Sequence, residues 1–323
     1  MAANTGETLV IHPGALGDVL LAVPALRALR GAFPGEALVL AAQPRIGRLL
    51  TALGVSDRDV AFDSLHLDAL FVDESAADHR GDPTLAAPTP LSPKIGGAAR
   101  VVCWFGARDP TFVRRLSELA PGALVCPPTP SDDTLVWEHL ARSVSAIAPG
   151  PPERGPIAVP QSLEAAGRRG LLDAAWDGTT RLVLIHPGAG GAGKRWPVEG
   201  FARVLEELTR SRDLAVVIHQ GPADGEAVEA LLARHRAGAI RLIEPSLPVL
   251  AGVLGRVAGY LGNDSGISHL AAAVGASAVV LFRKEMLAWR PWSAAARPLV
   301  VATETLDLAD VAAVTAGARV LLG

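Results

Sequence analysis

The chain has 323 residues, of which half are hydrophobic and one-fifth are charged, so it can build two packed cores and is not a disordered chain. Its only two cysteines, Cys103 and Cys126, exclude a disulfide scaffold and a CxxC metal motif. The net charge is −3, with −4 in residues 1–150 and +1 in the remainder, so neither half is a basic nucleic-acid surface.

The N-terminal half alternates short apolar runs with helical patterns. The spacing predicts strands over 8–11, 37–41, 60–62, 100–105 and 123–125, and helices over 17–30, 45–53, 111–119 and 133–147. Pro24 lies inside the first helical pattern and should interrupt that helix. Residues 73–97 are rich in Pro, Ala and Asp and predict a long loop.

Residues 148–160 contain five prolines and cannot continue a helix or a central strand, so we expect a linker there. Beyond it, the pattern predicts strands over 181–185, 214–219, 239–243, 257–261 and 278–282, and helices over 198–211, 223–236, 247–253, 266–274 and 306–322. We therefore predict an N-terminal domain over 1–155, a C-terminal domain over 156–305, and a helix over 306–323 packing near the domain junction.

Regular alternation of strands and helices implies parallel sheets with right-handed crossovers, covered by helices on both faces. The prediction is an α/β protein of two facing Rossmann-like domains, with a ligand cleft between the domains at the carboxyl ends of the strands.

The longest apolar run, residues 270–282, is about 13 residues long, whereas a membrane span needs about 20. The first seven residues lack the basic and apolar regions of a signal peptide. We therefore expect a cytoplasmic protein with no transmembrane segment and no nucleic-acid partner; peripheral contact with the inner face of the membrane stays open.

One turn follows the first clear strand of each half: His12-Pro13-Gly14-Ala15 and His186-Pro187-Gly188-Ala189. It is either a strand-ending turn used twice or a pair of turns lining one cleft. On the second interpretation, His12, Gly14 and Gly17 are candidates for the acceptor side.

The second turn opens a glycine-rich loop that precedes a helix. Backbone amides of Gly188, Ala189 and Gly190 could hold a phosphate, and Lys194 could add a positive charge. The loop is not a Walker A motif, because no Ser or Thr follows the lysine. The alternative is a flexible loop with a solvated lysine.

The segment 262–269 also joins a predicted strand to a helix. Ser265 and Gly266 could grip a pyrophosphate and Asp264 could bind sugar hydroxyls, or Asp264 or Ser265 could simply cap the helix. His269, one turn further on, is expected to be a buried histidine with satisfied hydrogen bonds.

Two further acidic sites have competing interpretations. Asp18 could be a general base or an ordinary acid at a helix start. Asp224 and Glu226 could bind ribose hydroxyls or be helix-start acids. Asp57-Arg58-Asp59 nominally fits a DxD metal motif, but we interpret it as a surface turn and predict no metal site.

Three groups of motifs, taken in their order along the chain, resemble the ADP-heptose:lipopolysaccharide heptosyltransferase family, glycosyltransferase family 9. They are Gly17-Asp18-Val19-Leu20 with Pro24 and Leu26; His186-Pro187-Gly188 followed by Lys194, Trp196-Pro197 and Phe201; and Gly262, Asp264-Ser265-Gly266 and Ser268-His269-Leu270 with Ala272 and Gly275. The chain departs from the family at Ala189-Gly190-Gly191, where some members have hydroxyl residues, and at Phe282-Arg283-Lys284, where many have Gly-Pro-Ser/Thr.

The resemblance implies a GT-B fold and an inverting, metal-independent transfer of a sugar, with heptose from ADP-heptose as the expected donor and a glycan or lipopolysaccharide-type acceptor. It implies no cofactor besides the ADP-linked sugar. Asp18 matches the catalytic base, Lys194 the phosphate-neutralising lysine, Asp264 the donor-sugar acid and Glu226 the ribose-binding acid. Alternatives are a GT-B-like sugar-nucleotide epimerase and a non-catalytic nucleotide-sugar-binding homologue.

Overall fold

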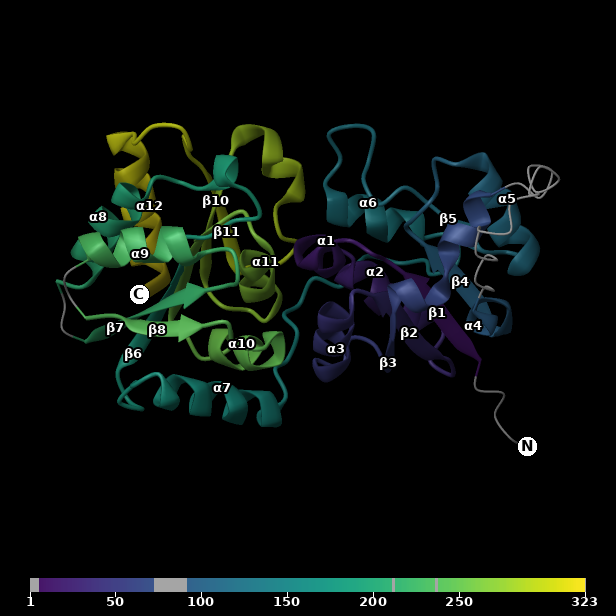
Figure 1. Cartoon of the computed structure of the whole chain (residues 1–323), viewed down its shortest axis with the longest axis horizontal. Helices are drawn as coiled ribbons and strands as arrows, with labels where there is room; N and C mark the ends of the chain where they lie inside the picture. Colours follow the sequence, from purple (N-terminus) through teal and green to yellow (C-terminus); the bar gives the residue numbers. More distant parts are fainter. Residues whose placement is uncertain (1–5, 73–91, 211–212, 236–237, 323) are drawn as a thin grey trace, which may run out of the picture. The chain divides into compact units, whose positions relative to one another are not determined.

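A computed structural model describes residues 6–72, 92–210, 213–235 and 238–322 (Figure 1). The chain forms two compact units. The first contains residues 1–15 and 22–153, and the second contains residues 16–21 and 154–323. Helix α1 (Leu16–Leu21) belongs to the second unit, where it packs against another helix. The residues directly before and after α1 belong to the first unit.

The first unit is built on a five-stranded parallel sheet of order β3-β2-β1-β4-β5. Its strands are β1 (Glu7–Ile11), β2 (Ala37–Ala42), β3 (Arg58–Ala61), β4 (Arg100–Cys103) and β5 (Leu124–Val125). Its helices are α2 (Val23–Ala32), α3 (Pro44–Ala52), α4 (Pro93–Gly97), α5 (Pro110–Leu119) and α6 (Val136–Ser143), with the 3-10 turns η1 (Phe62–Leu65) and η2 (Leu67–Phe71).

The predicted interruption of the first helix is confirmed. Helix α1 ends at Leu21 and α2 begins at Val23, with Pro24 in its first turn, where a missing N–H costs no helical hydrogen bond. Most of the predicted loop 73–97 lies outside the described residues, but its last five residues, Pro93–Gly97, form α4. The expected surface turn at residues 57–59 is wrong, because Arg58 and Asp59 begin strand β3.

The second unit is built on a six-stranded parallel sheet of order β11-β10-β9-β6-β7-β8. Its strands are β6 (Arg181–His186), β7 (Leu214–Gln220), β8 (Ile240–Ile243), β9 (Gly259–Asn263), β10 (Ala278–Phe282) and β11 (Ala296–Val300). Its helices are α7 (Gln161–Asp173), α8 (Val198–Leu208), α9 (Gly225–Arg234), α10 (Leu247–Leu254), α11 (Gly266–Ala273) and α12 (Leu308–Leu322), with the 3-10 turns η4 (Ala192–Lys194) and η5 (Lys284–Trp289).

One strand and one α-helix of this unit were missing from the sequence prediction. Strand β11 contains Pro298, which usually argues against a strand; it is tolerated here because β11 is an edge strand. Helix α7 follows the proline-rich segment directly. It packs so closely on α10 that a Cβ atom at Gly167 would overlap the backbone of Gly252.

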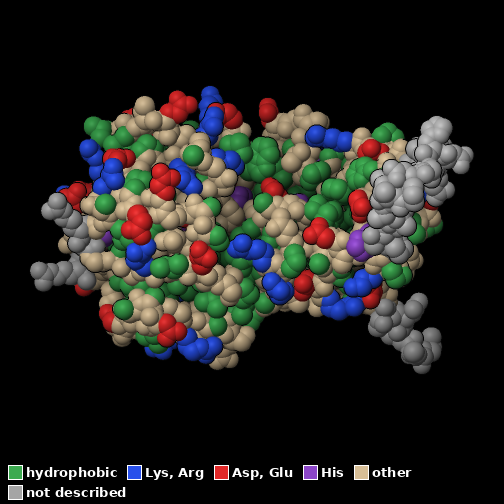
Figure 2. All heavy atoms as spheres, viewed as in Figure 1, with side chains coloured by type: hydrophobic (Ala, Val, Ile, Leu, Met, Phe, Trp, Pro, Cys, Tyr) green, Lys and Arg blue, Asp and Glu red, His purple; other side chains and the backbone are tan. Residues whose placement is uncertain are grey.

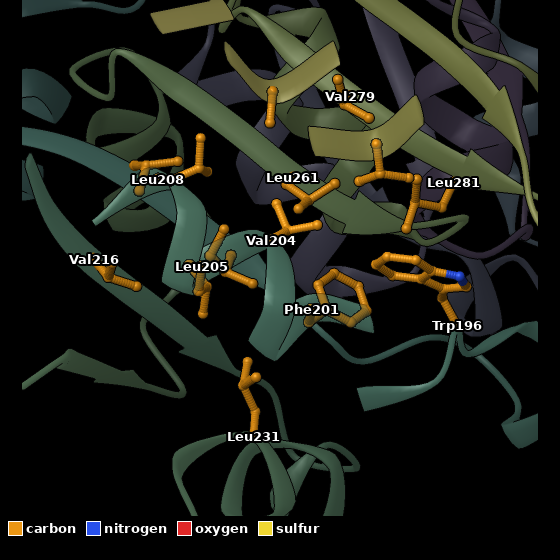
Figure 3. Close-up of a cluster of buried hydrophobic side chains, with 14 of the residues drawn as sticks. Trp196, Phe201, Val204, Leu205, Leu208, Val216, Leu231, Leu261, Val279 and Leu281 are labelled. Carbon is orange, nitrogen blue, oxygen red and sulfur yellow. The ribbon is translucent and has the colours of Figure 1, made fainter. Parts of the chain in front are cut away.

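One apolar cluster of the second unit is formed by residues of α8, α9 and α12 and of strands β6, β7, β9 and β10 (Figure 3). Trp196 and Phe201 meet edge to face with ring centroids 5.2 Å apart, and α8 adds Val204 and Leu205. Helix α12 packs on α8 and on β9, β10 and β11. Its buried Val314 and Ala318 make it an integral layer of this unit.

No helix among the described residues is long and apolar enough to cross a membrane. On the face shown in Figure 2, acidic and basic side chains are interspersed rather than gathered into a continuous basic surface.

Candidate active site

The glycine-rich loop leaves the carboxyl end of the central strand β6. The first residues of the loop, Gly188 and Ala189, are buried, whereas residues 190–193 are exposed. This exposed backbone leads into the η4 turn, which ends at Lys194, and the Lys194 side chain is about one-third exposed. A bare glycine backbone beside a partly exposed lysine can accept a phosphate or diphosphate.

A buried asparagine that the sequence reasoning missed holds both ends of this loop. The Nδ2 group of Asn263 donates to the Pro187 carbonyl at 2.8 Å, and its Oδ1 accepts from the backbone N–H of Trp196 at 3.0 Å. Asn263 ends strand β9 and is fully buried. The only sequence signal was its place directly before Asp264, because the partners lie about seventy residues away in the chain.

Asp264 and Lys194 come together across the same edge of the sheet. Lys194 Nζ lies 2.8 Å from Asp264 Oδ2, and His269 Nε2 lies 3.8 Å from Asp264 Oδ1. Burial opposes the charged form of the carboxylate, but His269 and Lys194 hold the pKa of Asp264 below its usual value. Asp264 is therefore an anion that can accept hydrogen bonds, and Lys194 is a cation placed beside it.

The start of α11 confirms the capping interpretation for Ser265, whose Oγ accepts from the Ser268 backbone N–H at 3.3 Å. Ser268 Oγ in turn donates to the Asn263 carbonyl at 2.5 Å and contacts the Tyr260 hydroxyl at 2.8 Å. Capping leaves the amides of the first turn pointing outward, so it does not conflict with binding an anion there.

Helix α1 brings Asp18 to this part of the second unit. A Cβ atom at Gly266 would lie 2.8 Å from Leu16 Cβ, and one at Gly17 would lie 3.0 Å from His269 Cδ2. The indole nitrogen of Trp292 donates to the Leu20 carbonyl at 2.9 Å. Asp18 is half-buried and directly follows Gly17, which packs against His269, the neighbour of Asp264.

The two acids near α9 have different surroundings. The Glu226 side chain is 93% exposed, and its carboxylate lies 3.9 Å from Arg195 Nη1. Asp224 is buried, and its Oδ2 accepts from the Gly221 N–H at 2.9 Å. Glu226 is thus accessible to a ligand, and Asp224 belongs to the interior.

Two histidines accompany Asp224 in that interior. His186 Nδ1 lies 3.1 Å from His219 Nδ1, and burial lowers the pKa of both imidazoles, that of His219 to about 3. His186, His219 and Asp224 lie close enough together to share a metal ion. Among the described residues, they are the one such group of three His, Cys, Asp or Glu side chains.

The acceptor-side candidate His12 also lies in the interior, beside the turn at Gly14 of the first unit. His12 is buried against Trp104, with its Nδ1 accepting from the Gly14 N–H at 3.2 Å and its Nε2 unpartnered among the described residues. Burial lowers the pKa of His12 to about 4. His12 therefore shapes the turn at Gly14 from beneath rather than facing solvent.

A pocket of about 660 Å³ lies beside that turn in the first unit. It is lined by Pro13, Gln43, Pro44, Arg45, Arg48, Phe62 and Asp63. The two arginines are exposed and form no salt bridge with any other residue that the structure describes. The pocket combines guanidinium donors, a carboxylate and an aromatic ring, a mixture suited to a sugar with an anionic group.

Comparison with known proteins agrees with this arrangement. Residues 158–312 match the model of "Glycosyltransferase family 9 (heptosyltransferase)". The second unit thus carries a glycosyltransferase family 9 domain, matched over 155 of the 323 residues of the chain. No curated protein gave a significant match.

Solved structures show the same fold over the whole chain. A family 9 glycosyltransferase from Veillonella parvula is 17% identical with a TM-score of 0.75, covering 100% of this chain and 98% of that one. E. coli ADP-heptose LPS heptosyltransferase II is 18% identical with a TM-score of 0.71, covering 98% of each chain. E. coli heptosyltransferase WaaC with ADP is 14% identical with a TM-score of 0.65, covering 98% of this chain and 99% of that one.

These findings confirm the predicted resemblance and the α/β GT-B fold class of two parallel-stranded sheets. The family 9 match of the second unit and the shared fold together support a heptosyltransferase-like glycosyltransferase. The matched region 158–312 contains the glycine-rich loop, Lys194 and Asp264, but not Asp18.

Proposed function

We propose that the chain is a family 9 glycosyltransferase that transfers heptose from ADP-heptose to a hydroxyl group of a glycan or lipopolysaccharide-type acceptor, with inversion and without a catalytic metal. The observation that carries the proposal is the contact series Lys194–Asp264–His269–Gly17 within the second unit. It joins a phosphate-binding cation, a sugar-binding acid and the helix of the candidate base.

The donor is assigned to the loop and the start of α11. The diphosphate would lie over the exposed glycine backbone from Gly190 and the first turn at Ser265 and Gly266, with Gly188 and Ala189 supporting the loop from beneath. Glu226 is exposed beside α9 and is proposed to bind the ribose hydroxyls. The ADP-bound and ADP-heptose-using relatives support an adenine nucleotide.

In the transfer step, Asp18 removes the proton of the acceptor hydroxyl, and the acceptor oxygen forms a bond to the anomeric carbon. The bond from that carbon to the diphosphate oxygen breaks, and ADP leaves with the electron pair. Lys194 and the backbone amides offset the charge that develops on the diphosphate, so no metal is required for this role. Attack opposite the leaving group inverts the anomeric centre.

The acceptor is assigned to the first unit, where the pocket at Gln43, Arg45, Arg48 and Phe62 supports binding of an anionic sugar. Gly14 lies beside this pocket, and His12 supports the turn beneath it. The first unit also contains three arginines close together in sequence, Arg108, Arg114 and Arg115. However, Arg114 pairs with Glu118, and Arg115 donates to the Ala69 and Val72 carbonyls. We further propose that the reaction takes place in the cytoplasm, where peripheral membrane contact would suit a glycolipid acceptor.

The test is to incubate the chelator-treated protein with ADP-heptose and a panel of glycan and glycolipid acceptors. We expect acceptor-dependent release of ADP and a glycoside of inverted configuration by NMR. Retention of configuration, or loss of activity on chelation that Mg²⁺ restores, would contradict the mechanism. Conversion of ADP-heptose without an acceptor would indicate an epimerase, and binding without turnover on any acceptor would indicate a non-catalytic homologue.

A further inference from the structure

Beneath the glycine-rich loop, three buried side chains from three elements converge. His186 ends β6, His219 lies near the end of β7, and Asp224 directly precedes α9. One ligand atom from each lies within 4.8 Å of the others, and the two Nδ1 atoms are 3.1 Å apart. None of the three has a role in the proposed transfer.

Two glycines leave space for the Asp224 carboxylate. A Cβ atom at Gly188 would overlap the Asp224 carboxylate, and one at Gly221 would lie 2.7 Å from its Oδ2. Asp224 therefore occupies a slot between two glycines. Its Oδ2 is fixed by the Gly221 N–H at 2.9 Å, which leaves Oδ1 as an acceptor within the cluster.

The spacing suits a small divalent cation. Two ligands about 2.0–2.1 Å from a tetrahedral Zn²⁺ lie roughly 3.3 Å from each other, close to the 3.1 Å between the imidazole nitrogens. Two imidazoles and one carboxylate form a common zinc ligand set. The nearby Arg195 has its own partners, since it donates to the Ala223 carbonyl and lies 3.9 Å from Glu226.

We propose that His186, His219 and Asp224 bind one Zn²⁺ ion through Nδ1, Nδ1 and Oδ1. The ion ties the carboxyl ends of β6 and β7 to the start of α9 and supports the glycine-rich loop from below. This role is structural and separate from transfer, which uses Asp18, Lys194 and Asp264.

The test measures metal binding directly, without donor or acceptor, so it stands apart from the test of the proposed function. Protein stripped with chelator is dialysed against Zn²⁺ and its metal content is measured. We expect one equivalent per chain in the wild type, and loss of that equivalent in His219→Gln and Asp224→Asn. His235→Gln, another buried histidine of the same unit, should retain it.

A Co²⁺ titration of the wild type checks the geometry even if a variant fails to fold. Tetrahedral Co²⁺ should give visible absorption bands that saturate at one equivalent and disappear on adding Zn²⁺. The proposal is overturned if wild type and folded His219→Gln bind equal amounts of Zn²⁺, or if no tetrahedral Co²⁺ spectrum forms; the two imidazoles would then simply hydrogen bond to each other.

Discussion

The ammonium nitrogen of Lys194 lies 2.8 Å from Oδ2 of Asp264, although seventy residues separate them in the chain. The cation proposed to hold the donor diphosphate is thus paired with the acid proposed to hold the donor sugar. An entering diphosphate competes with Asp264 for Lys194, so the two residues should affect nucleotide binding in opposite directions.

Lys194→Ala should weaken ADP binding about 10- to 100-fold, because a charged hydrogen bond contributes about 1.5–3 kcal/mol. Asp264→Asn should leave ADP affinity unchanged or raise it, since the lysine loses its competing anion, while transfer of the sugar falls. Isothermal titration with ADP checks both variants. Equal weakening by both would show that the pair acts as a single structural unit.

Asp18→Asn should reduce the turnover number by about 10²–10⁴, the usual contribution of a general base, and leave donor affinity within about twofold. Steady-state kinetics and titration with ADP-heptose separate the two effects. Asp68→Asn, at an exposed acid on η2, is the control and should be unaffected. Near-normal turnover of Asp18→Asn would remove Asp18 from the mechanism.

Gly266→Ala should impair transfer by displacing α1, because its Cβ would lie 2.8 Å from Leu16 Cβ and 3.2 Å from the Gly17 nitrogen. A misplacement of about 1 Å can cost about 100-fold in rate. Gly225→Ala is the matched control: it also changes the first residue of a helix, but its nearest new contact, Gln220 Nε2, is 3.9 Å away. Equal rates in the two variants would contradict the role assigned to α1.

The buried His12 should make the first unit less stable in mild acid. Its pKa is lowered to about 4, so between pH 6.5 and 4 the unfolded chain takes up a proton that the folded chain does not. Stability is therefore lost as pH falls through this window, by about 2 kcal/mol between pH 7 and 5. Denaturant unfolding of His12→Asn, which can still accept from Gly14, should show a smaller loss. An identical loss would exclude His12 as its source.

Close helix contact should make Gly167 intolerant of any side chain. Gly167→Ala would force its Cβ into the Gly252 backbone and should destabilise the second unit by about 1–3 kcal/mol or more. Gly170→Ala in the same helix meets only the Val249 side chain at 3.3 Å, which can move. Thermal unfolding compares the pair, and similar melting temperatures would contradict the packing described.

Local patterns predicted most of the fold. Strand and helix periodicity located the parallel sheets, and Pro24 marked the break between α1 and α2. Strand β11 was missed because Pro298 counts against a strand unless it is known to be at an edge. The assignment of α1 to the second unit could not be read from the sequence, since it depends on contacts with α11 far along the chain.

The candidate site was predicted in part. The residue types at Lys194, Asp264 and Ser265 signalled their chemistry through glycines and a strand-to-helix turn. Asn263 and the cluster of His186, His219 and Asp224 carried no comparable signal, because their partners come from separate strands and meet only after the sheet forms. The exposed arginines of the first-unit pocket were likewise indistinguishable from ordinary surface charges.

Titration of wild type and Lys194→Ala with ADP-heptose and with GDP-, UDP- and TDP-sugars tests the donor-site assignment directly. We expect ADP-heptose to bind the wild type at least about tenfold more tightly than the other sugar nucleotides, and Lys194→Ala to lose most of this affinity. Absence of binding by every sugar nucleotide, or equal binding of ADP-heptose to both proteins, would contradict the assignment of the glycine-rich loop as the donor site.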